Sequence, residues 1–339
     1  MDLRQLRYFL AVVDEGGVHR AAAALHVAQP SLSQALRKLE HDLGANLFHR
    51  IGRRLVLSPA GEALLGPARQ MLRTVDAAYD AVREVADVEA GRLDVASLAD
   101  LSADPTAIWV ARFRVANRGV TARVEERGYA AQVADLVRTG ECEIGVTVLP
   151  LPEEYLAQER LLTQHFVLIT PPGSEEALPA TVSLASLSGV PLVMGERHAT
   201  TREWVESTLR AHGVEPSVAV EVPQRGAVIP MVLNGAGAAV VPLRLALDAR
   251  LHDAVVRELD PPLTREVGLL HRPGALTAAA AAFLAHTRDG VASWSRAVER
   301  RRRAGAGLIE AAASTERSVR HRLRSGFASD PPAPTHDDR

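Results

Sequence analysis

The sequence predicts a mixed α/β protein: a small, mostly helical N-terminal part, one long linking helix, and a larger α/β part of two lobes. Three patterns carry this prediction. Helical apolar repeats and a short hairpin pattern occupy residues 1–58, one long helical repeat covers residues 59–90, and strand and helix patterns alternate from residue 91 onward. A chain of 339 residues is long enough for two or three such domains.

The composition is that of a globular protein, with 47% hydrophobic and 24% charged residues and a formal net charge of −2. Although this global charge indicates no particular partner, residues 1–58 carry eight Lys or Arg against five Asp or Glu. Cys142 is the only cysteine, so it cannot form an intrachain disulfide, and we expect a buried structural thiol in a reducing cytoplasm. The N-terminus does not resemble a signal peptide, and no apolar run approaches the ~20 residues that span a bilayer, so we expect no membrane association.

Residues 18–43 predict two short helices joined by a tight bend. The first helix, Val18–Leu25, is rich in alanine, and Pro30 stands near the start of the second, where its fixed φ is tolerated. The second helix has a leucine stripe on one side and small polar and basic side chains on the other, which suits the major groove of DNA. The alternative is an ordinary helical hairpin with a solvated polar face. The stripe consists of Leu32, Leu36, Leu39 and Leu43.

The flanking sequence favours DNA binding. Leu3–Asp14 predicts a third helix, and residues 47–57 predict two short strands around a tip at Gly52-Arg53, so that residues 1–58 form a winged helix-turn-helix whose helix pair covers residues 18–37. Small polar and basic side chains on the helix would read bases and bind phosphate, and arginines of the wing would hold the DNA backbone or the minor groove. The predicted DNA contacts are Pro30, Ser31, Ser33, Gln34, Arg37 and Lys38 on the helix, and Arg50, Arg53 and Arg54 on the wing.

In these residues the chain resembles the N-terminal domain of LysR-type transcriptional regulators. The resemblance rests on LRQLRYFLAVVDEGG, RAAAALHVAQPSLSQALRKLEHDLGANLFHR and GRRLVLSPAG, and it covers about the first 65 residues without gaps. Where the family usually has Ser-Phe, this chain has Gly17-Val18, and glycine is a weaker N-cap by a few tenths of a kcal/mol, which concerns local stability rather than a DNA contact. The resemblance implies a regulator that binds double-stranded operator DNA as a homodimer or homotetramer, with RNA polymerase as a further candidate partner.

Residues 59–90 predict a dimerisation helix. Ser58-Pro59 and Glu62 are typical of a helix start, and Pro67 is expected to kink the helix near its first turns. Small and apolar residues then recur at steps of four and three, the repeat of helices that pair in coiled coils. The alternative is a helix that packs on its own domain, whereas the resemblance implies dimerisation. The seam consists of Leu64, Ala68, Met71, Val75, Ala78, Val82 and Val85.

Residues 91–290 alternate between strand and helix, which predicts a mostly parallel sheet covered by helices. The predicted strands are residues 93–97, 120–125, 142–148, 161–170, 190–194, 217–222, 238–241 and 266–270, and the predicted helices are residues 104–116, 130–139, about 202–212, about 227–234 and 276–288. Two crossover points suggest lobe I at residues 92–161 plus 267–290 and lobe II at residues 162–266. Here the resemblance to LysR-type regulators is weaker and rests on VIPMVLNGAGAAVVP at residues 228–242. It implies an effector-binding domain similar to periplasmic solute-binding proteins, with a cleft between the lobes.

The cleft follows from that resemblance, and its candidate residues follow predicted strands. Hydroxyls, an arginine and a helix N-terminus together suit a small carboxylate-bearing metabolite. Ordinary N-capping by the two threonines and a surface arginine is the alternative. The candidate effector-binding residues are Ser97, Ser102, Gly128, Thr147, His198, Thr200, Thr201, Arg202 and Gln224.

Residues 291–339 depart from the family. Nine arginines stand against three acids in residues 296–324, and the Pro-rich stretch ASDPPAPTHDDR is expected to be disordered. A basic extension could add salt-sensitive DNA affinity, but we favour a solvated helix followed by a disordered tail.

No catalytic motif, phosphate-binding loop or metal-ligand spacing occurs, so we expect neither an enzyme nor a cofactor or metal. His19, His26, His41 and His49 are scattered through the N-terminal part and are interpreted as core or surface histidines. The leading hypothesis is a DNA-binding regulator controlled by a small effector. A small-molecule carrier or enzyme with an accessory helical domain, and an architectural DNA-packing protein, are the alternatives; a ligand-dependent rise in thermal stability would separate them.

Overall fold

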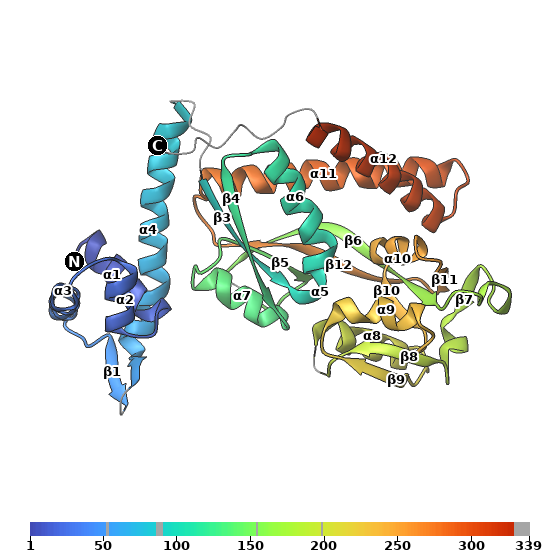
Figure 1. Ribbon diagram of the computed structural model, residues 1–339, viewed down its shortest axis with the longest axis horizontal. Helices are drawn as coiled ribbons and strands as arrows, with labels where there is room; N and C mark the ends of the chain where they lie inside the picture. The colour runs from blue at the N-terminus through green and yellow to red at the C-terminus, as the bar shows by residue number, and fades with distance from the viewer. Residues whose placement is uncertain (52–53, 86–90, 154, 198, 329–339) are drawn as a thin grey trace, which may run out of the picture.

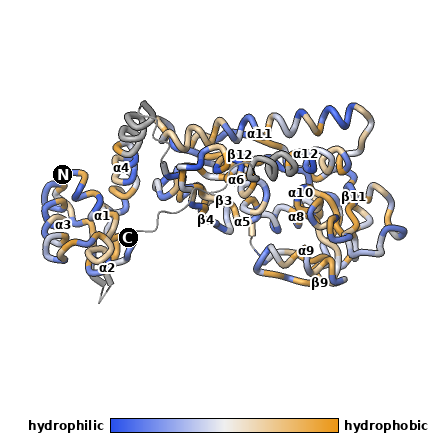
Figure 2. The backbone as a smooth tube through the Cα atoms, turned by 45° about the horizontal axis from the view of Figure 1, so that its top comes forward, coloured by the Kyte–Doolittle hydropathy of each residue, from blue (hydrophilic) through white to orange (hydrophobic). Residues whose placement is uncertain are grey.

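The computed structural model describes residues 1–51, 54–85, 91–153, 155–197 and 199–328, with the backbone alone for residues 50–51, 54, 76–85, 177 and 320–328. Figure 1 shows a small N-terminal part beside one tall helix, α4, and a larger α/β part on the other side of that helix. Hydrophobic residues gather in the strands of the α/β part, whereas the last turns of its long helix α11 are hydrophilic (Figure 2).

The N-terminal part is a three-helix unit followed by a hairpin. Asp2 caps the first helix with its side chain in a reciprocal pair with Gln5. Leucines and Phe9 of the three helices form one core, in which Leu32 and Leu39 are fully buried. The elements are α1 (Leu3–Asp14), α2 (Val18–Ala24), α3 (Gln29–Leu43), β1 (Phe48–Ile51) and β2 (Arg54–Leu57).

Two details of this unit concern the predicted helix pair. Gly17 is the N-cap of α2 and, having no side chain, provides no capping hydrogen bond. The predicted leucine stripe is one residue too long, because Leu43 is 40% exposed in the last turn of α3, just before Gly44 ends the helix in the left-handed conformation.

Helix α4 (Pro59–Val85) begins at the predicted position. The Ser58 hydroxyl accepts a hydrogen bond from the Gly61 amide at 3.0 Å, and a Cβ on Gly61 would lie 2.2 Å from the Leu47 carbonyl oxygen, so glycine lets the helix start pack on the hairpin. The first turns of α4 pack on the N-terminal core, where Ala68 is fully buried and Leu64 contributes as well. The expected seam is therefore wrong for Ala68, which the chain's own helices already cover, whereas Leu64 is only partly buried.

The rest of the expected seam lies further along α4. Met71 is 39% exposed and Val75 is half-buried. The side chains of Ala78, Val82 and Val85 lie outside the described residues.

Lobe I surrounds the parallel strands β4, β3 and β5, in that order in the sheet. Its core includes Phe113, Ile144 and Phe283 from three different elements. Cys142 is buried there, and burial raises the pKa of its thiol to about 12. The elements are β3 (Gly91–Leu98), α6 (Ala107–Ala116), β4 (Val120–Arg127), α7 (Ala130–Arg138), β5 (Ile144–Leu149) and α11 (Ala278–Arg303).

The helix expected to begin at Asp104 is divided. The chain forms α5 (Ala99–Leu101) and a π-helical turn, η1 (Ser102–Thr106), before α6 begins at Ala107. Asp104 has the extended angles φ −150° and ψ 116° because the following Pro105 disfavours the helical region at the residue before it.

Two long antiparallel strands, β6 (Ala157–Thr170) and β12 (Leu263–His271), connect the lobes, in agreement with the two expected crossovers. Lobe II continues the sheet and adds a small parallel pair, β8 and β9. Helix α10, strands β7 and β11 and the short helices of this lobe were not expected. The elements of lobe II are β7 (Thr181–Ser183), β8 (Pro191–Gly195), α8 (Thr200–Ala211), β9 (Ser217–Val222), α9 (Val228–Leu233), β10 (Ala239–Pro242), α10 (Leu243–Arg250), β11 (Val255–Asp260) and the short helices η2 (Glu175–Ala177), η3 (Leu184–Leu187) and η4 (Arg225–Ala227).

The C-terminal region differs most from the expectation. Helix α11 continues without a break across residue 290, so no boundary falls there. Helix α12 (Leu308–Ala328) then turns back along α11 (Figure 1). Its Ala312 and Ala313 are buried in the core of lobe II. A merely solvated helix is therefore wrong, and the tail expected to be disordered, residues 328–339, lies outside the described residues except for Ala328.

Candidate DNA-binding surface and inter-lobe cavity

The polar face of α3 is the first candidate site. Pro30, Ser31, Gln34, Arg37 and Lys38 are exposed and Ser33 is half-buried. The leucines on the opposite side of the helix anchor it in the core, so this face is held toward solvent at the edge of the molecule away from the α/β part (Figure 1).

The wing residues are described less completely. Arg50 and Arg54 belong to β1 and β2, which pair antiparallel, with Ile51 opposite Arg54. The side chains of Arg50 and Arg54, and the whole of Arg53 at the tip, lie outside the described residues.

The second candidate site is a cavity of about 170 Å³ between the lobes. Lobe I contributes Ala99, Asp100 and Ala103, from the segment that follows β3. Lobe II contributes β8, the first turns of α8, the η4–α9 segment and β10, all with mainly aliphatic side chains. The cavity is thus lined by both lobes, as a ligand-controlled cleft requires.

A buried arginine holds the two lobes together beside this cavity. Arg265 of β12 donates to Asp100 at 2.6 Å, to Thr201 at 2.6 Å and to Gln164 at 2.9 Å. Its guanidinium also lies over the ring of Phe166, 4.9 Å from the centroid. Burial lowers the pKa of Arg265, and the charge of Asp100 opposes that effect.

The two arginines that line the cavity differ. Arg202 is already hydrogen-bonded within the protein, because it donates to Glu206, Glu221 and the Gly195 carbonyl at 2.7 Å each. Burial opposes its charge, but the hydrogen bonds to the two glutamates raise its pKa overall. Arg225 is 26% exposed and lies 3.7 Å from Asp100.

Of the expected effector residues that the structure describes, two, Thr201 and Arg202, line this cavity. Ser97 is fully buried and hydrogen-bonds Thr106 at 2.9 Å, and Thr147 is fully buried in β5. Both side chains point into the protein. Successive side chains of a strand point to opposite faces of the sheet, and the position of a residue along the strand does not by itself show which face borders the cleft.

The other expected residues that the structure describes are not part of the cavity lining either. Ser102 donates to Glu126, Thr200 donates to the Gly128 carbonyl at 3.3 Å, and Gln224 is the exposed residue before η4. His198 lies outside the described residues.

The sequence interpretation missed Asp100, Arg225 and Arg265. Arg225 directly follows the expected Gln224, and Asp100 lies between the expected Ser97 and Ser102. Both residues therefore belong to segments that the sequence predicts at the cleft. Arg265 stands one residue before the predicted strand, and no local pattern marks it as a residue of the cleft.

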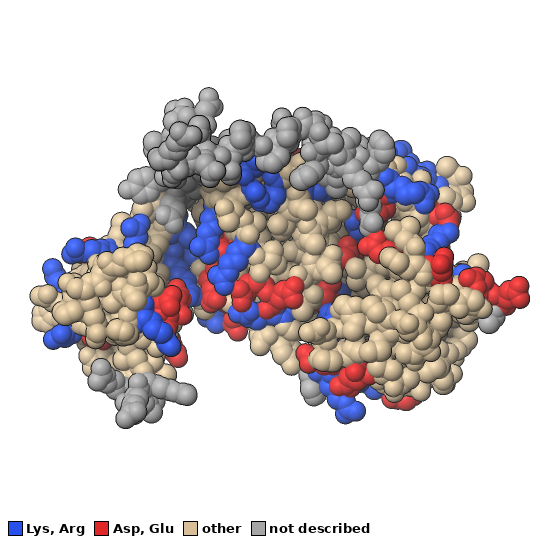
Figure 3. Space-filling model, viewed as in Figure 1, with Lys and Arg blue, Asp and Glu red and all other residues tan. Residues whose placement is uncertain are grey.

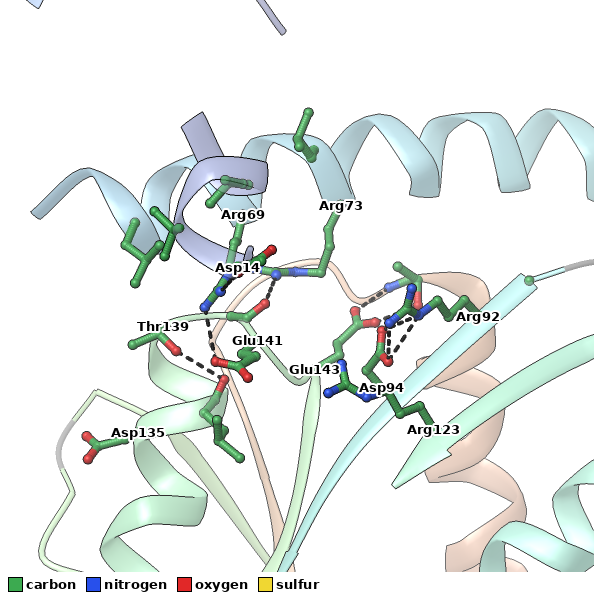
Figure 4. Close-up of a pocket in the computed structure, with 18 residues that line it drawn as sticks. Asp14, Arg69, Arg73, Arg92, Asp94, Arg123, Asp135, Thr139, Glu141 and Glu143 are labelled. Atoms are coloured by element: carbon green, nitrogen blue, oxygen red, sulfur yellow. Dashed lines mark hydrogen bonds and ion pairs between the residues drawn. The ribbon is translucent and has the colours of Figure 1, made fainter. Parts of the chain in front are cut away.

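A larger hollow of about 1090 Å³ lies between α4 and lobe I. Arg69 of α4 bridges Asp14 of α1 at 2.7 Å and Glu141 of lobe I at 3.4 Å (Figure 4). Arg73 donates to the Gly140 carbonyl, and burial, with the charge of Arg272, lowers its pKa to about 10. Charges of both signs gather here (Figure 3), so contacts between opposite charges join the N-terminal part to lobe I.

Two family models match the chain. The bacterial regulatory helix-turn-helix protein, lysR family, matches residues 3–62, and the LysR substrate binding domain matches residues 86–292. The chain is 34% identical over 282 residues to the HTH-type transcriptional regulator IlvR of Caulobacter vibrioides, covering 80% of this chain and 92% of that protein. The HTH-type transcriptional regulator TfdS of Cupriavidus pinatubonensis is 29% identical over 292 residues, 86% of this chain and 99% of that protein.

Solved structures show the same fold. Full-length OxyR from Pseudomonas aeruginosa superposes with a TM-score of 0.68 at 24% identity, over 86% of this chain and 94% of that one. CbnR in complex with its target DNA superposes with a TM-score of 0.59 at 24% identity, over 85% of this chain and 99% of that one.

The winged helix-turn-helix and the two-lobed domain therefore define a DNA-binding transcriptional regulator, and not an enzyme. The chain belongs to the LysR family. Within the described residues no helix is long and apolar enough to cross a membrane, and no three His, Cys, Asp or Glu side chains gather as a metal site would require.

Proposed function

We propose that this regulator reads a specific operator with the exposed face of α3 and that a small carboxylate-type metabolite in the inter-lobe cavity controls it. The observation that carries the first part is the exposure of Gln34, Arg37 and Lys38 on a helix whose opposite side is buried. Gln34 is suited to base edges, Lys38 to phosphate, and the wing arginines to the DNA backbone.

The proposed domain arrangement is a DNA-binding domain at residues 1–58, a linker helix at residues 59–90 and an effector-binding domain that begins at residue 91. We place all of α11 and α12 in the effector-binding domain, instead of ending it at residue 290. We propose that the outer part of α4, where Met71 is exposed, pairs in a homodimer or homotetramer. Two copies would grip half-sites about 34 Å apart or at multiples of that spacing. RNA polymerase is a proposed further partner.

The effector part of the proposal rests on the cavity between the lobes. A ligand that contacts both lobes stabilises the arrangement of the lobes in which both contacts are made. The largest change that it can cause in the free energy of DNA binding is set by the difference between its affinities for the two lobe arrangements. Arg225 is the cation that faces such a ligand.

Two substitutions test the DNA-binding roles. Gln34→Ala should weaken operator binding by about 1–3 kcal/mol and relax specificity at one base position, whereas Arg54→Ala should weaken binding to all sequences and lower the salt dependence. The operator is identified by sequencing DNA that the purified protein retains, and affinities are then measured by electrophoretic shift on operator and random duplexes at several salt concentrations. Equal losses for both variants on both duplexes would reject this division of roles.

A further inference from the structure

Asp100, a residue that lines the inter-lobe cavity, has a buried carboxylate oxygen without a hydrogen-bond partner among the described residues. Asp100 lines the cavity and is only 6% exposed, and its Oδ2 is bonded to Arg265. Its Oδ1 is buried and has no hydrogen-bond partner in the part of the chain that the structure describes. Buried polar atoms nearly always have a partner, so this oxygen calls for a donor that the protein itself does not supply.

A cation stands beside that acceptor. Arg225 lies 3.7 Å from Asp100, lines the same cavity and is partly exposed. Asp100 therefore faces two guanidinium groups, Arg265 and Arg225, with a single negative charge. Because the other lining arginine, Arg202, is neutralised by Glu206 and Glu221, the polar end of the cavity keeps one positive charge and favours a ligand with one negative charge.

The remainder of the cavity is aliphatic. Its walls include Leu192, Val193, Val205, Ile229 and Val241, and among the residues that the structure describes no aromatic side chain lines it. The volume of about 170 Å³ is below the ~300–1,000 Å³ of pockets that take drug-sized ligands. This wall favours a short alkyl chain over an aromatic ring or a second charged group.

We infer that the ligand is a small aliphatic acid with a hydrogen-bond donor on the carbon next to its carboxylate, an α-hydroxy or α-amino acid. The carboxylate pairs with Arg225, the α-donor fills Asp100 Oδ1, and the alkyl chain packs on the aliphatic wall of lobe II. An α-substituted acid carries its donor and its carboxylate on adjacent carbons, as the neighbouring positions of Asp100 and Arg225 require. The single positive charge favours the α-hydroxy acid, because the α-amino acid is a zwitterion without net charge.

This inference rests on the proposed function and names its effector class. It also assigns each lobe a role, because Asp100 belongs to lobe I and Arg225 to lobe II. A ligand that bonds to both residues joins the lobes, whereas an acid without the α-donor makes no hydrogen bond to Asp100 of lobe I.

A ligand series tests the donor. Calorimetric titration of the full-length protein compares α-hydroxyisocaproate, leucine and isocaproate, which share one carbon skeleton, with phenyllactate as the aromatic member. We expect α-hydroxyisocaproate to bind most tightly and isocaproate about ten- to a hundredfold more weakly, because Asp100 Oδ1 stays unfilled. Equal affinities for these two acids would overturn the inference, and so would the absence of binding by both α-substituted aliphatic acids at millimolar concentration.

A pair of variants tests the cation. Arg225→Gln should weaken α-hydroxyisocaproate binding about tenfold or more, whereas Arg303→Gln, at an exposed arginine of α11 paired with Glu299, should leave it unchanged. Unchanged binding by Arg225→Gln would contradict the inference. If a dicarboxylate or an aromatic acid binds in an Arg225-dependent way while the aliphatic series does not, the ligand class is wrong although the proposed function stands.

Discussion

Two ionic clusters join lobe I to lobe II, and they differ in how their charges are balanced. Beside the cavity, Arg265 lies 2.6 Å from Asp100. In the second cluster, Arg244 of α10 lies 3.0 Å from Asp104 of η1 and 3.0 Å from Glu316 of α12. In the first cluster the arginine has a single carboxylate and neutral partners, whereas in the second two carboxylates share one arginine.

The consequence is visible at Asp104. Burial raises the pKa of Asp104 to about 6, Arg244 lowers it, and the charge of Glu316 raises it again. The second cluster also reaches α12, which lies beyond the residues 86–292 matched by the family model. We therefore expect the contact between the lobes at Arg265 to be independent of pH and of α12. The contact at Arg244 should depend on pH and on α12.

The largest expected effect is on stability at the first cluster. Arg265→Ala should lower the free energy of unfolding by about 3–5 kcal/mol, because it removes the guanidinium that is hydrogen-bonded to the buried Asp100. Urea denaturation at neutral pH measures it, with Arg303→Ala as the control, because the exposed ion pair of Arg303 with Glu299 should contribute at most about 1 kcal/mol. Similar losses for both variants would contradict the special role of Arg265.

The next effect is a pH dependence at the second cluster. A buried carboxyl with a raised pKa binds its proton more tightly in the folded state, so its contribution to stability falls as pH rises from about 4 to about 6. The groups that act on Asp104 are Arg244, Glu316, Gln164 and Asp248. The change amounts to about 3 kcal/mol for a shift of about two pKa units.

Asp104→Asn removes this titration. The difference in unfolding free energy between wild type and Asp104→Asn should therefore decrease as pH rises through this range, whereas Asp135→Asn, at an exposed residue of α7, should give a nearly flat difference. A flat difference for Asp104→Asn would show that the carboxyl titrates normally.

The smallest effect tests the link to α12. Glu316→Gln removes a negative charge near Asp104, so it should lower the pKa of Asp104 and move the pH transition to lower pH, with a stability loss of about 1 kcal/mol. The control is Glu310→Gln, since Glu310 is 57% exposed on the same helix and pairs with Arg250. An unchanged transition in Glu316→Gln would mean that α12 does not influence the second cluster.

Local patterns predicted most of the elements. The bounds of α1, Leu3–Asp14, and of β9, Ser217–Val222, agree with the predicted bounds, because side-chain periodicity and end residues determine short elements. The predictions were wrong where packing intervenes: Ala68 was assigned to a partner helix, Ser97 to the cleft, and α12 to solvent.

By itself, the sequence determined the helix-turn-helix with its exposed polar face, the long α4 and the two-lobed α/β order, since each depends on neighbours a few residues apart. Only the tertiary structure decided the polar end of the cavity. Asp100 and Arg265 are 165 residues apart in the chain, and Asp104 and Glu316 are still further apart. Charges at such separations meet only when the whole chain is folded, because the sheet crossover and the return of α12 bring them together.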